Sequence, residues 1–166
     1  MAELHTALRE QARHLAQRER KRPKQASLRR AVSTAYYALF HRLTFDAARF
    51  LIPGRQGALR AKVRRAFVHG DMKTVARAYA AGSPPQPWSG LAAPPSPELR
   101  RVAKLFVELQ QKRHEADYDT EAAFSKSEVV ALLARLDRSF SDLDDMSREG
   151  REVFGVALLL NKQVRG

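Results

Sequence analysis

Apolar residues recur at steps of three and four along most of the chain, which is the spacing of one face of an α-helix. The longest such run predicts a central core helix from about Lys24 to Ile52. Its apolar face is formed by Leu28, Val32, Ala35, Leu39, Leu43, Ala47 and Phe50. A second run predicts a major helix that Ser125 and Glu128 open as a capping box and that Gly150 ends. The core face of that helix is formed by Val129, Leu132, Leu133, Leu136, Phe140 and Leu143.

Shorter stretches with the same periodicity predict five further helices. They run from about Ala2 to Arg20, Ala58 to Val68, Asp71 to Ala80, Glu98 to Glu115 and Val153 to Leu160. The Pro53-Gly54 and His69-Gly70 pairs are expected to interrupt the helical pattern, and Asp71 is expected to cap the helix that follows it. The last of these helices is an apolar tail that either completes the core or docks on a second copy of the chain.

Residues 81–97 contain six prolines and two glycines, so they cannot form a regular helix or a paired strand. We expect an ordered flap or a flexible linker there, inside a single domain of residues 1–166. Trp88, at the middle of this loop, either anchors the loop on the core or offers a stacking platform for a base. No stretch alternates with the two-residue period of a strand. The sequence therefore predicts an all-α fold.

The chain carries a formal net charge of +12, and the whole excess lies in its first 70 residues. Residues 1–70 hold 16 Lys and Arg against four acidic residues, whereas residues 71–166 hold 14 of each. A segregated charge is typical of a surface that meets a phosphate backbone, although Arg-rich helices can also be simply well solvated. The basic residues expected to follow the backbone of an RNA are Arg29, Arg30, Arg60, Lys62, Arg64, Arg65 and Lys112.

Several classes of protein are disfavoured by what the sequence lacks. It has no cysteine, which excludes a disulfide framework, a thiolate metal site and a cysteine nucleophile. It has no Gly-rich phosphate loop, no His-Glu-x-x-His pair and no dinucleotide fingerprint, so we expect neither a metal site nor a cofactor. No apolar run approaches the roughly 20 residues of a membrane span, and no leader-like segment follows Met1. We therefore expect a cytoplasmic protein that does not bind a membrane.

Two segments bring together side chains that can carry chemistry. Tyr37 and His41 lie four residues apart on one face of the predicted core helix, where they either support a site or form a hydrogen-bonded pair. Residues 112–119 gather two cations, a histidine, a phenol and three acids at a helix end. Such crowding shifts ionisation equilibria, which is typical of functional sites. His5 and His14 are expected to be ordinary surface histidines of the first helix.

These segments resemble the motifs of the HEPN superfamily of small helical-bundle proteins. The motifs are Ala-Tyr-Tyr-Ala-Leu-Phe-His at residues 35–41 and Arg-x-x-Ala-Asp-Tyr at residues 113–118, and the likeness covers about residues 24–145. The resemblance implies a four-helix bundle with additional short helices, frequent dimerisation and, in many members, a metal-independent RNA-cleaving site built on an Arg-x4-6-His motif. Many such proteins act as toxins or in defence against phage.

The sequence departs from the HEPN cleavage motif at one position, because Arg113 is followed five residues later by Tyr118 and not by a histidine. A tyrosine, with a free pKa near 10, is a poor general base at neutral pH. The expected roles are therefore a phosphate clamp for Arg113 and a general base or acid for His114 or His69. Asp117 and Tyr118 are expected to orient these groups.

Two other interpretations of these residues stay open. Arg64 and His69 also satisfy the Arg-x4-His spacing on a different helix, either as a supplementary phosphate-binding pair or by chance in an Arg-rich chain. Alternatively, Arg113, Asp117 and Tyr118 form a structural network at the end of their helix, with Arg113 on the late carbonyls and Tyr118 packed under the core.

The leading prediction is an RNA-directed protein, either a metal-independent endoribonuclease of the toxin or phage-defence type or a degenerate relative that binds RNA without cutting it. The alternative is a non-catalytic interaction module that forms a homodimer and binds a nucleotidyltransferase-type antitoxin or a larger effector complex. A third possibility is a binder of a nucleotide or another small anion. The salt dependence of binding separates the first possibility from the third. Binding of a polymer should weaken steeply as salt rises, because each neutralised phosphate releases about one counterion, whereas binding of a single small anion should weaken far less.

Overall fold

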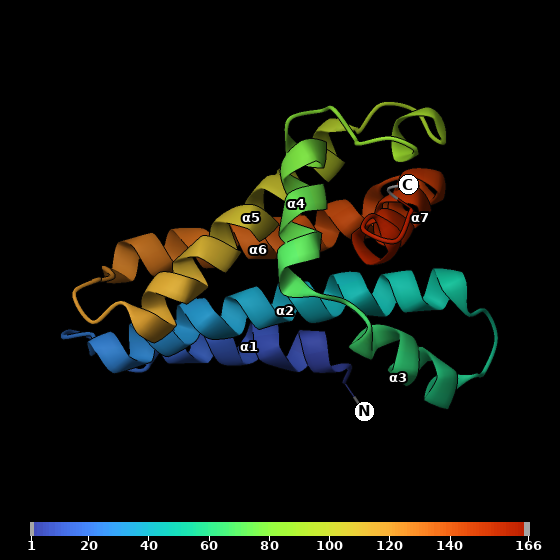
Figure 1. The fold of residues 1–166 in the computed structure, drawn as a ribbon. Coiled ribbons are helices and arrows are strands. Elements are labelled where there is room, and N and C mark those ends of the chain that lie inside the picture. The colour runs from blue at the N-terminus through green and yellow to red at the C-terminus, as the bar shows by residue number, and fades with distance from the viewer. Residues whose placement is uncertain (1, 165–166) are drawn as a thin grey trace. The chain divides into compact units, whose positions relative to one another are not determined.

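The computed structural model describes residues 2–164, and every regular element in that range is helical (Figure 1). Seven α-helices are α1 (Leu4–Gln17), α2 (Gln25–Leu51), α3 (Gly57–Arg65), α4 (His69–Ala80), α5 (Pro97–Tyr118), α6 (Lys126–Asp145) and α7 (Arg148–Leu160), with a short 3-10 helix η1 (Trp88–Gly90). The predicted all-α fold class is thereby confirmed. No helix in the described range is long and apolar enough to cross a membrane.

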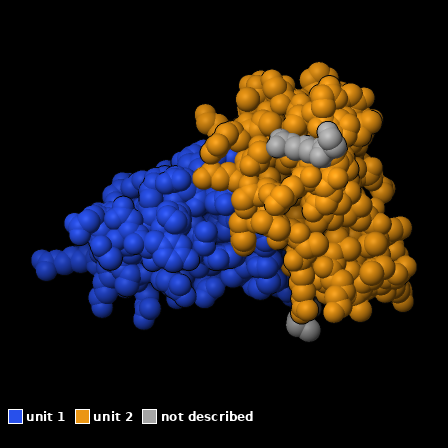
Figure 2. Space-filling view, viewed as in Figure 1, with its two compact units in different colours: residues 1–41, 105–140 blue, residues 42–104, 141–166 orange. Residues whose placement is uncertain are grey.

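The chain divides into two compact units (Figure 2). Unit 1 comprises Met1–His41 and Leu105–Phe140, and unit 2 comprises Arg42–Lys104 and Ser141–Gly166. Helix α1 belongs to unit 1, and α3, α4, η1 and α7 belong to unit 2. Helices α2, α5 and α6 each contribute residues to both units.

Unit 1 has a core of apolar side chains from its four helical segments. Tyr36 of α2 is completely buried, and its ring centroid lies 5.6 Å from that of Phe106 on α5. Leu136 and Phe140 of α6 and Ala12 of α1 are also buried. Removing large apolar side chains from water in this way is the main stabilising contribution to a helical bundle, at about 2 kcal/mol for each.

Unit 2 has its own core, to which the tail helix α7 contributes. Phe154 of α7 is buried, with its ring 4.8 Å from the ring of Tyr79 on α4. Gly155 lies directly against α2, since a Cβ atom built on it would come 3.0 Å from the Cβ of Ala47. The tail helix therefore completes a core within unit 2, as one of its two predicted placements required.

The two major helices lie where the apolar periodicity placed them. Every predicted core-face residue of α6 is buried, as are those of α2 except for the half-buried Phe50. The backbone N–H of Glu128 donates to the Ser125 hydroxyl at 3.1 Å, which confirms Ser125 as the cap of α6. The predicted end at Gly150 is wrong. Helix α6 ends at Asp145, and Gly150 lies in the first turn of α7, where the cost of a glycine is small.

The predicted start of α4 is also wrong. The chain is extended at Val68 and becomes helical at His69, so Asp71 lies within the first turn and makes no capping bond. Gly70 does not break the helix, because a glycine keeps its backbone N–H and costs only conformational entropy, which matters less at a helix end than in its interior. A negative charge in the first turn still interacts favourably with the helix dipole, which accounts for Asp71 without a cap.

Four other helix limits and one burial prediction need correction. Helices α1 and α3 each end three residues before their predicted limits, and α5 continues three residues further, to Tyr118. Helix α7 begins at Arg148, five residues before its predicted start at Val153. The acidic and aromatic residues of that last turn do not interrupt the hydrogen-bond ladder, and Asp119 still donates its N–H to the carbonyl of Glu115. His14 is exposed as predicted, but His5 is buried, with its ring 5.9 Å from that of Phe140.

Candidate functional site

Arg113 of α5 points into unit 1. Its guanidinium lies over the ring of Tyr36, with Cζ 5.2 Å from the ring centroid, and its side chain is 16% exposed. One terminal nitrogen donates to the hydroxyl of Tyr37 at 3.5 Å and lies 3.7 Å from the carboxylate of Asp117. The Nε atom is buried and has no hydrogen-bond partner among the described residues. The Arg113 side chain is thus largely buried, and at least one of its N–H donors has no hydrogen-bond partner among the described residues.

Asp117, one turn after Arg113, connects α5 to α2. Its Oδ2 atom accepts a hydrogen bond from the Ser33 hydroxyl at 3.3 Å, and the same atom faces Arg113. The pairing of Arg113 with Asp117 agrees with both predictions for these residues, as part of a site and as part of a structural network. The structure therefore brings the two sequence motifs together, since Ser33 and Tyr37 belong to the α2 segment and Arg113 and Asp117 to the α5 segment.

An open groove of about 620 Å³ lies between α1 and α2, and it shares Ser33 and Tyr37 with this cluster. The wall from α2 carries Arg30, Ser33, Tyr37 and His41. The opposite wall carries Leu4, Leu8 and Leu15 of α1 and Arg18, the residue directly after that helix. The groove therefore combines two arginines, a histidine and a phenol with an apolar wall, and all of these residues belong to unit 1.

Tyr37 and His41, which the four-residue spacing placed on one face of α2, both line the groove. Their ring centroids are 6.3 Å apart, and the ring of His41 also meets the edge of the buried Phe40. Below them, burial raises the pKa of Tyr36 well above its ordinary value, against the opposing effect of the Arg113 charge. Tyr36 therefore stays a neutral phenol at neutral pH, and Tyr37 and His41 are the rings that a ligand in the groove meets.

The other two candidates of the α5 motif lie on a different face of the helix. His114 is exposed, and its ring centroid lies 5.1 Å from that of Tyr118, which is 67% exposed. Adjacent helical residues point about 100° apart, so His114 cannot share the inward direction of Arg113. The structure thus divides the motif into an inward pair, Arg113 and Asp117, and an outward pair, His114 and Tyr118. Tyr118 does not pack under the core.

Arg29 was expected to follow an RNA backbone, but its side chain is engaged elsewhere. One terminal nitrogen donates to the carbonyls of Ala116 at 3.1 Å and Asp119 at 2.7 Å. The other donates to the carbonyls of Thr120, at 3.2 Å, and Ala122. These four bonds use all four hydrogens of the two terminal nitrogens. Arg29 therefore fulfils the carbonyl-binding role that was considered for Arg113.

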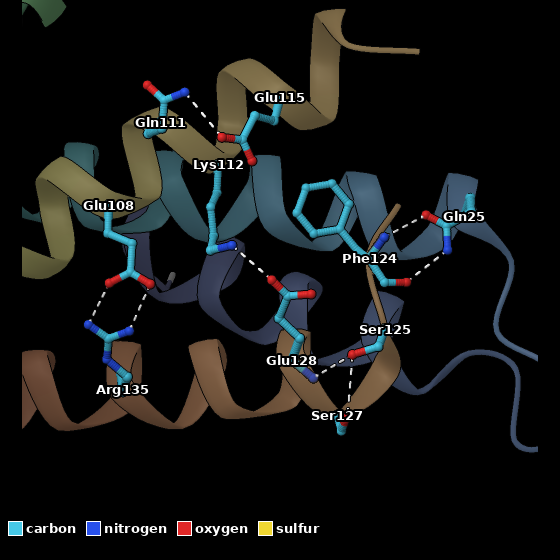
Figure 3. Close-up of polar contacts among 10 residues, drawn as sticks. All are labelled: Gln25, Glu108, Gln111, Lys112, Glu115, Phe124, Ser125, Ser127, Glu128 and Arg135. Carbon is cyan, nitrogen blue, oxygen red and sulfur yellow. Dashed lines mark hydrogen bonds and ion pairs between the residues drawn. The ribbon is translucent and has the colours of Figure 1, made fainter. Parts of the chain in front are cut away.

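Lys112 also has a partner within the protein. Its ammonium donates to the carboxylate of Glu128 at 2.8 Å, which ties α5 to the first turn of α6 (Figure 3). This hydrogen bond is the main cause that raises the pKa of Lys112 and lowers that of Glu128. One helical turn earlier on α5, Glu108 accepts two hydrogen bonds from Arg135, at 2.9 and 2.7 Å (Figure 3). Lys112 is thus engaged in the polar contacts between α5 and α6, although it was expected to follow an RNA backbone.

The remaining basic candidates and His69 lie in unit 2. Arg60 donates to the carbonyls of Ile52 and Gly54, and the guanidinium of Arg64 lies 5.8 Å from the ring centroid of Phe45. Lys62 and Arg65 are exposed on α3, and His69 is the half-buried first residue of α4. Within unit 2, Lys62 and Arg65 are therefore the predicted cations that the solvent reaches most readily.

Sequence reasoning missed part of the groove. Arg18 and Ser33 were not among the candidates, nor was the α1 wall. Ser33 could have been found, because Ser33, Tyr37 and His41 recur at steps of four, and Arg30 precedes them by three. Nothing in the sequence identified Arg18, because its place in the groove depends on how α1 packs on α2.

No protein-family model, curated protein or solved structure matches this chain. Across residues 2–164, no group of three His, Asp or Glu side chains gathers closely enough to hold a metal ion.

Proposed function

We propose that this chain is an HEPN-like, RNA-directed protein that holds single-stranded RNA in the α1–α2 groove of unit 1. The observation that carries this proposal is the convergence at one groove of Arg30, Tyr37 and His41, with Arg113 against the Tyr37 hydroxyl. Both motifs behind the HEPN resemblance contribute to this cluster. The basic surplus of residues 1–70 adds the long-range attraction that a polyanion experiences.

Each group in the groove has a role that its chemistry supports. Arg18 and Arg30 neutralise phosphates of the RNA backbone, because guanidinium forks match the geometry of phosphate oxygens. The Tyr37 ring offers a face on which an unpaired base stacks. Its oxygen accepts a hydrogen bond from Arg113, which holds the phenol at the wall of the groove.

Cleavage in this groove requires a proton acceptor, and His41 is the histidine on its walls. The 2′-hydroxyl would lose its proton to His41 as its oxygen forms a bond to the adjacent phosphorus. The bond from that phosphorus to the 5′-oxygen would break, and the leaving oxygen would take a proton from water. The products are a cyclic phosphate and a free 5′-hydroxyl, so the step needs neither a metal ion nor an oxidant.

The test is a cleavage and binding assay on end-labelled single-stranded RNA with EDTA present. His41→Ala and Arg113→Ala should abolish cleavage, whereas His114→Ala and His69→Ala, the histidines considered from the sequence, should leave it unchanged. Circular dichroism of each variant checks that it is folded. Binding without cleavage by the wild type assigns the non-cutting form of the function. Absence of RNA binding contradicts the proposal.

A second candidate function is supported by the apolar wall of the same groove. Leu4 is 50% exposed, and Leu4, Leu8 and Leu15 lie along α1 on the groove side. An apolar stripe beside a groove suits a helix of a protein partner, including a second copy of this chain. If the groove is a dimer contact, sedimentation will show a wild-type dimer that Leu4→Glu converts to a monomer. A wild-type monomer contradicts the form of this function in which a second copy of the chain occupies the groove.

A further inference from the structure

Unit 2 contains a cavity of about 410 Å³ between the Pro-rich loop and the start of α7. This volume lies within the range of about 300 to 1,000 Å³ that is usual for small-molecule sites. The cavity is formed by different residues from those of the α1–α2 groove, and it plays no part in the proposed RNA function.

The walls of this cavity are held in place by specific contacts. Helix α4 ends in a Schellman motif, in which Gly82 has φ +78° and Ser83 donates its N–H to the carbonyl of Ala78 at 3.0 Å. The loop that follows is anchored by Trp88, which is buried and donates its indole N–H to Asn161 at 3.0 Å. This finding supports the anchoring alternative for Trp88. Several prolines restrict the loop between these points, so the cavity is largely preformed.

The lining of the cavity selects the charge of its ligand. Tyr79, Trp88, Leu99, Met146 and Val153 contribute apolar surface, and serine hydroxyls contribute neutral polar groups. Glu149 is the one charged residue among the described residues of the lining. Within residues 2–164 no lysine or arginine lines the cavity, although the chain has 30 of them. A phosphate or carboxylate ligand would face the Glu149 carboxylate, and the described lining offers it no lysine or arginine.

We propose that this cavity binds a small amphipathic amine, with its apolar body between the loop and α7 and its ammonium group at Glu149. The apolar walls supply the affinity, because removing a hydrophobic group from water is favourable in proportion to the area buried. The carboxylate of Glu149 supplies the preference for a cation. Burial raises the pKa of the neighbouring Tyr79 to about 12, so its phenol stays neutral and adds no second charge to the cavity.

The chain offers a built-in reporter, because Trp88 lines the cavity and is the single tryptophan of the sequence. Its fluorescence is to be titrated with phenethylamine, 2-phenylethanol and phenylacetate, which share a phenyl body and differ in charge. The amine should bind about five- to tenfold more tightly than the alcohol, as an ion pair with the exposed Glu149 allows, and phenylacetate should bind most weakly. Equal binding of all three probes, or no change with any of them, overturns the proposal.

Two variants separate the role of Glu149 from a general effect of charge. Glu149→Gln should remove the preference for the amine and leave the affinity for 2-phenylethanol unchanged. Glu10→Gln makes the same change of charge on α1, outside the cavity, and should keep the wild-type preference. Ala93→Phe, at an exposed lining position, should weaken all three probes by filling the cavity. A preference for the amine that survives Glu149→Gln overturns the proposal.

Discussion

Arg29 and Arg30 are neighbours in the sequence, yet their side chains have different surroundings. Arg29 donates to four backbone carbonyls at the end of α5 and in the loop after it, whereas Arg30 is exposed on a wall of the groove. The sequence shows two equivalent basic residues. Their roles differ because the carbonyls that bind Arg29 come from residues about 90 positions away, which no local pattern reveals.

This difference predicts opposite effects of two matched substitutions. Arg29→Ala leaves carbonyls at the end of α5 without their partners, so the free energy of unfolding should fall by about 2 kcal/mol. Arg30→Ala removes an exposed side chain and should change it by less than about 0.5 kcal/mol. Urea unfolding measures both values. A loss of stability in Arg30→Ala equal to that in Arg29→Ala would be inconsistent with these assigned positions.

At the scale of single elements, the sequence predicted helices well and their contacts poorly. Ser125 was correctly identified as the cap of α6 because the capping residue and the apolar periodicity lie in one stretch of sequence. The side chain of Glu128 was expected to reach back to the start of the helix, but it pairs with Lys112 of α5 instead (Figure 3). A tertiary contact therefore replaced half of a local motif.

The Lys112–Glu128 pair predicts a dependence of stability on pH. The Lys112 hydrogen bond lowers the pKa of Glu128 below its ordinary value of 4.5, so the stabilisation is present above that value and lost as the pH falls through the lowered pKa. Because Glu128 is largely solvated, the loss should be a few tenths of a kcal/mol. Urea midpoints measured at about five pH values from pH 3 to pH 7 should fall less on acidification for Glu128→Gln than for the wild type. An identical fall in both proteins would exclude this contribution.

The close contact of α7 with α2 in unit 2 predicts an unusual effect of alanine. Gly155→Ala would place a Cβ 3.0 Å from the Cβ of Ala47 and 3.2 Å from its Cα, so overpacking should outweigh the gain in helix propensity and cost about 1 kcal/mol. Gly150→Ala, on the same helix, meets only the Ser147 hydroxyl at 3.6 Å and should be neutral or slightly stabilising. Thermal unfolding compares the two. A stabilised Gly155→Ala variant would contradict the contact.

At the scale of the whole molecule, the all-helical fold could be predicted from periodicity, because the buried face of a helix appears in its sequence as apolar residues at steps of three and four. The groove did not follow in the same way. Tyr37 and His41 were found from their spacing, but the groove also needs α1, whose sequence does not show which face packs on α2. The motif at Arg113 was found as a cluster. The division of this motif into the inward pair, Arg113 and Asp117, and the outward pair, His114 and Tyr118, could be seen only in the structure, which gives the direction of each side chain.

The charge distribution acts at this scale as well. The surplus of +12 in residues 1–70 is shared between the two units, and part of it is neutralised by contacts within the protein, as for Arg42 with Asp46 at 2.9 Å. Net charge alone therefore does not give the number of cations that an RNA meets. That number is accessible from the salt dependence of binding, because each phosphate contact releases counterions.

The most direct test of RNA binding in the groove is the affinity for a labelled single-stranded oligouridylate over a range of salt concentrations. We predict that Arg30→Ala weakens binding at low salt and reduces the slope of log K against log salt by about 0.7, the value for one contact on a single strand. Arg138→Ala removes an exposed arginine of unit 1 outside the groove and should leave affinity and slope unchanged. Equal effects of the two substitutions, or no binding by the wild type, would contradict the account.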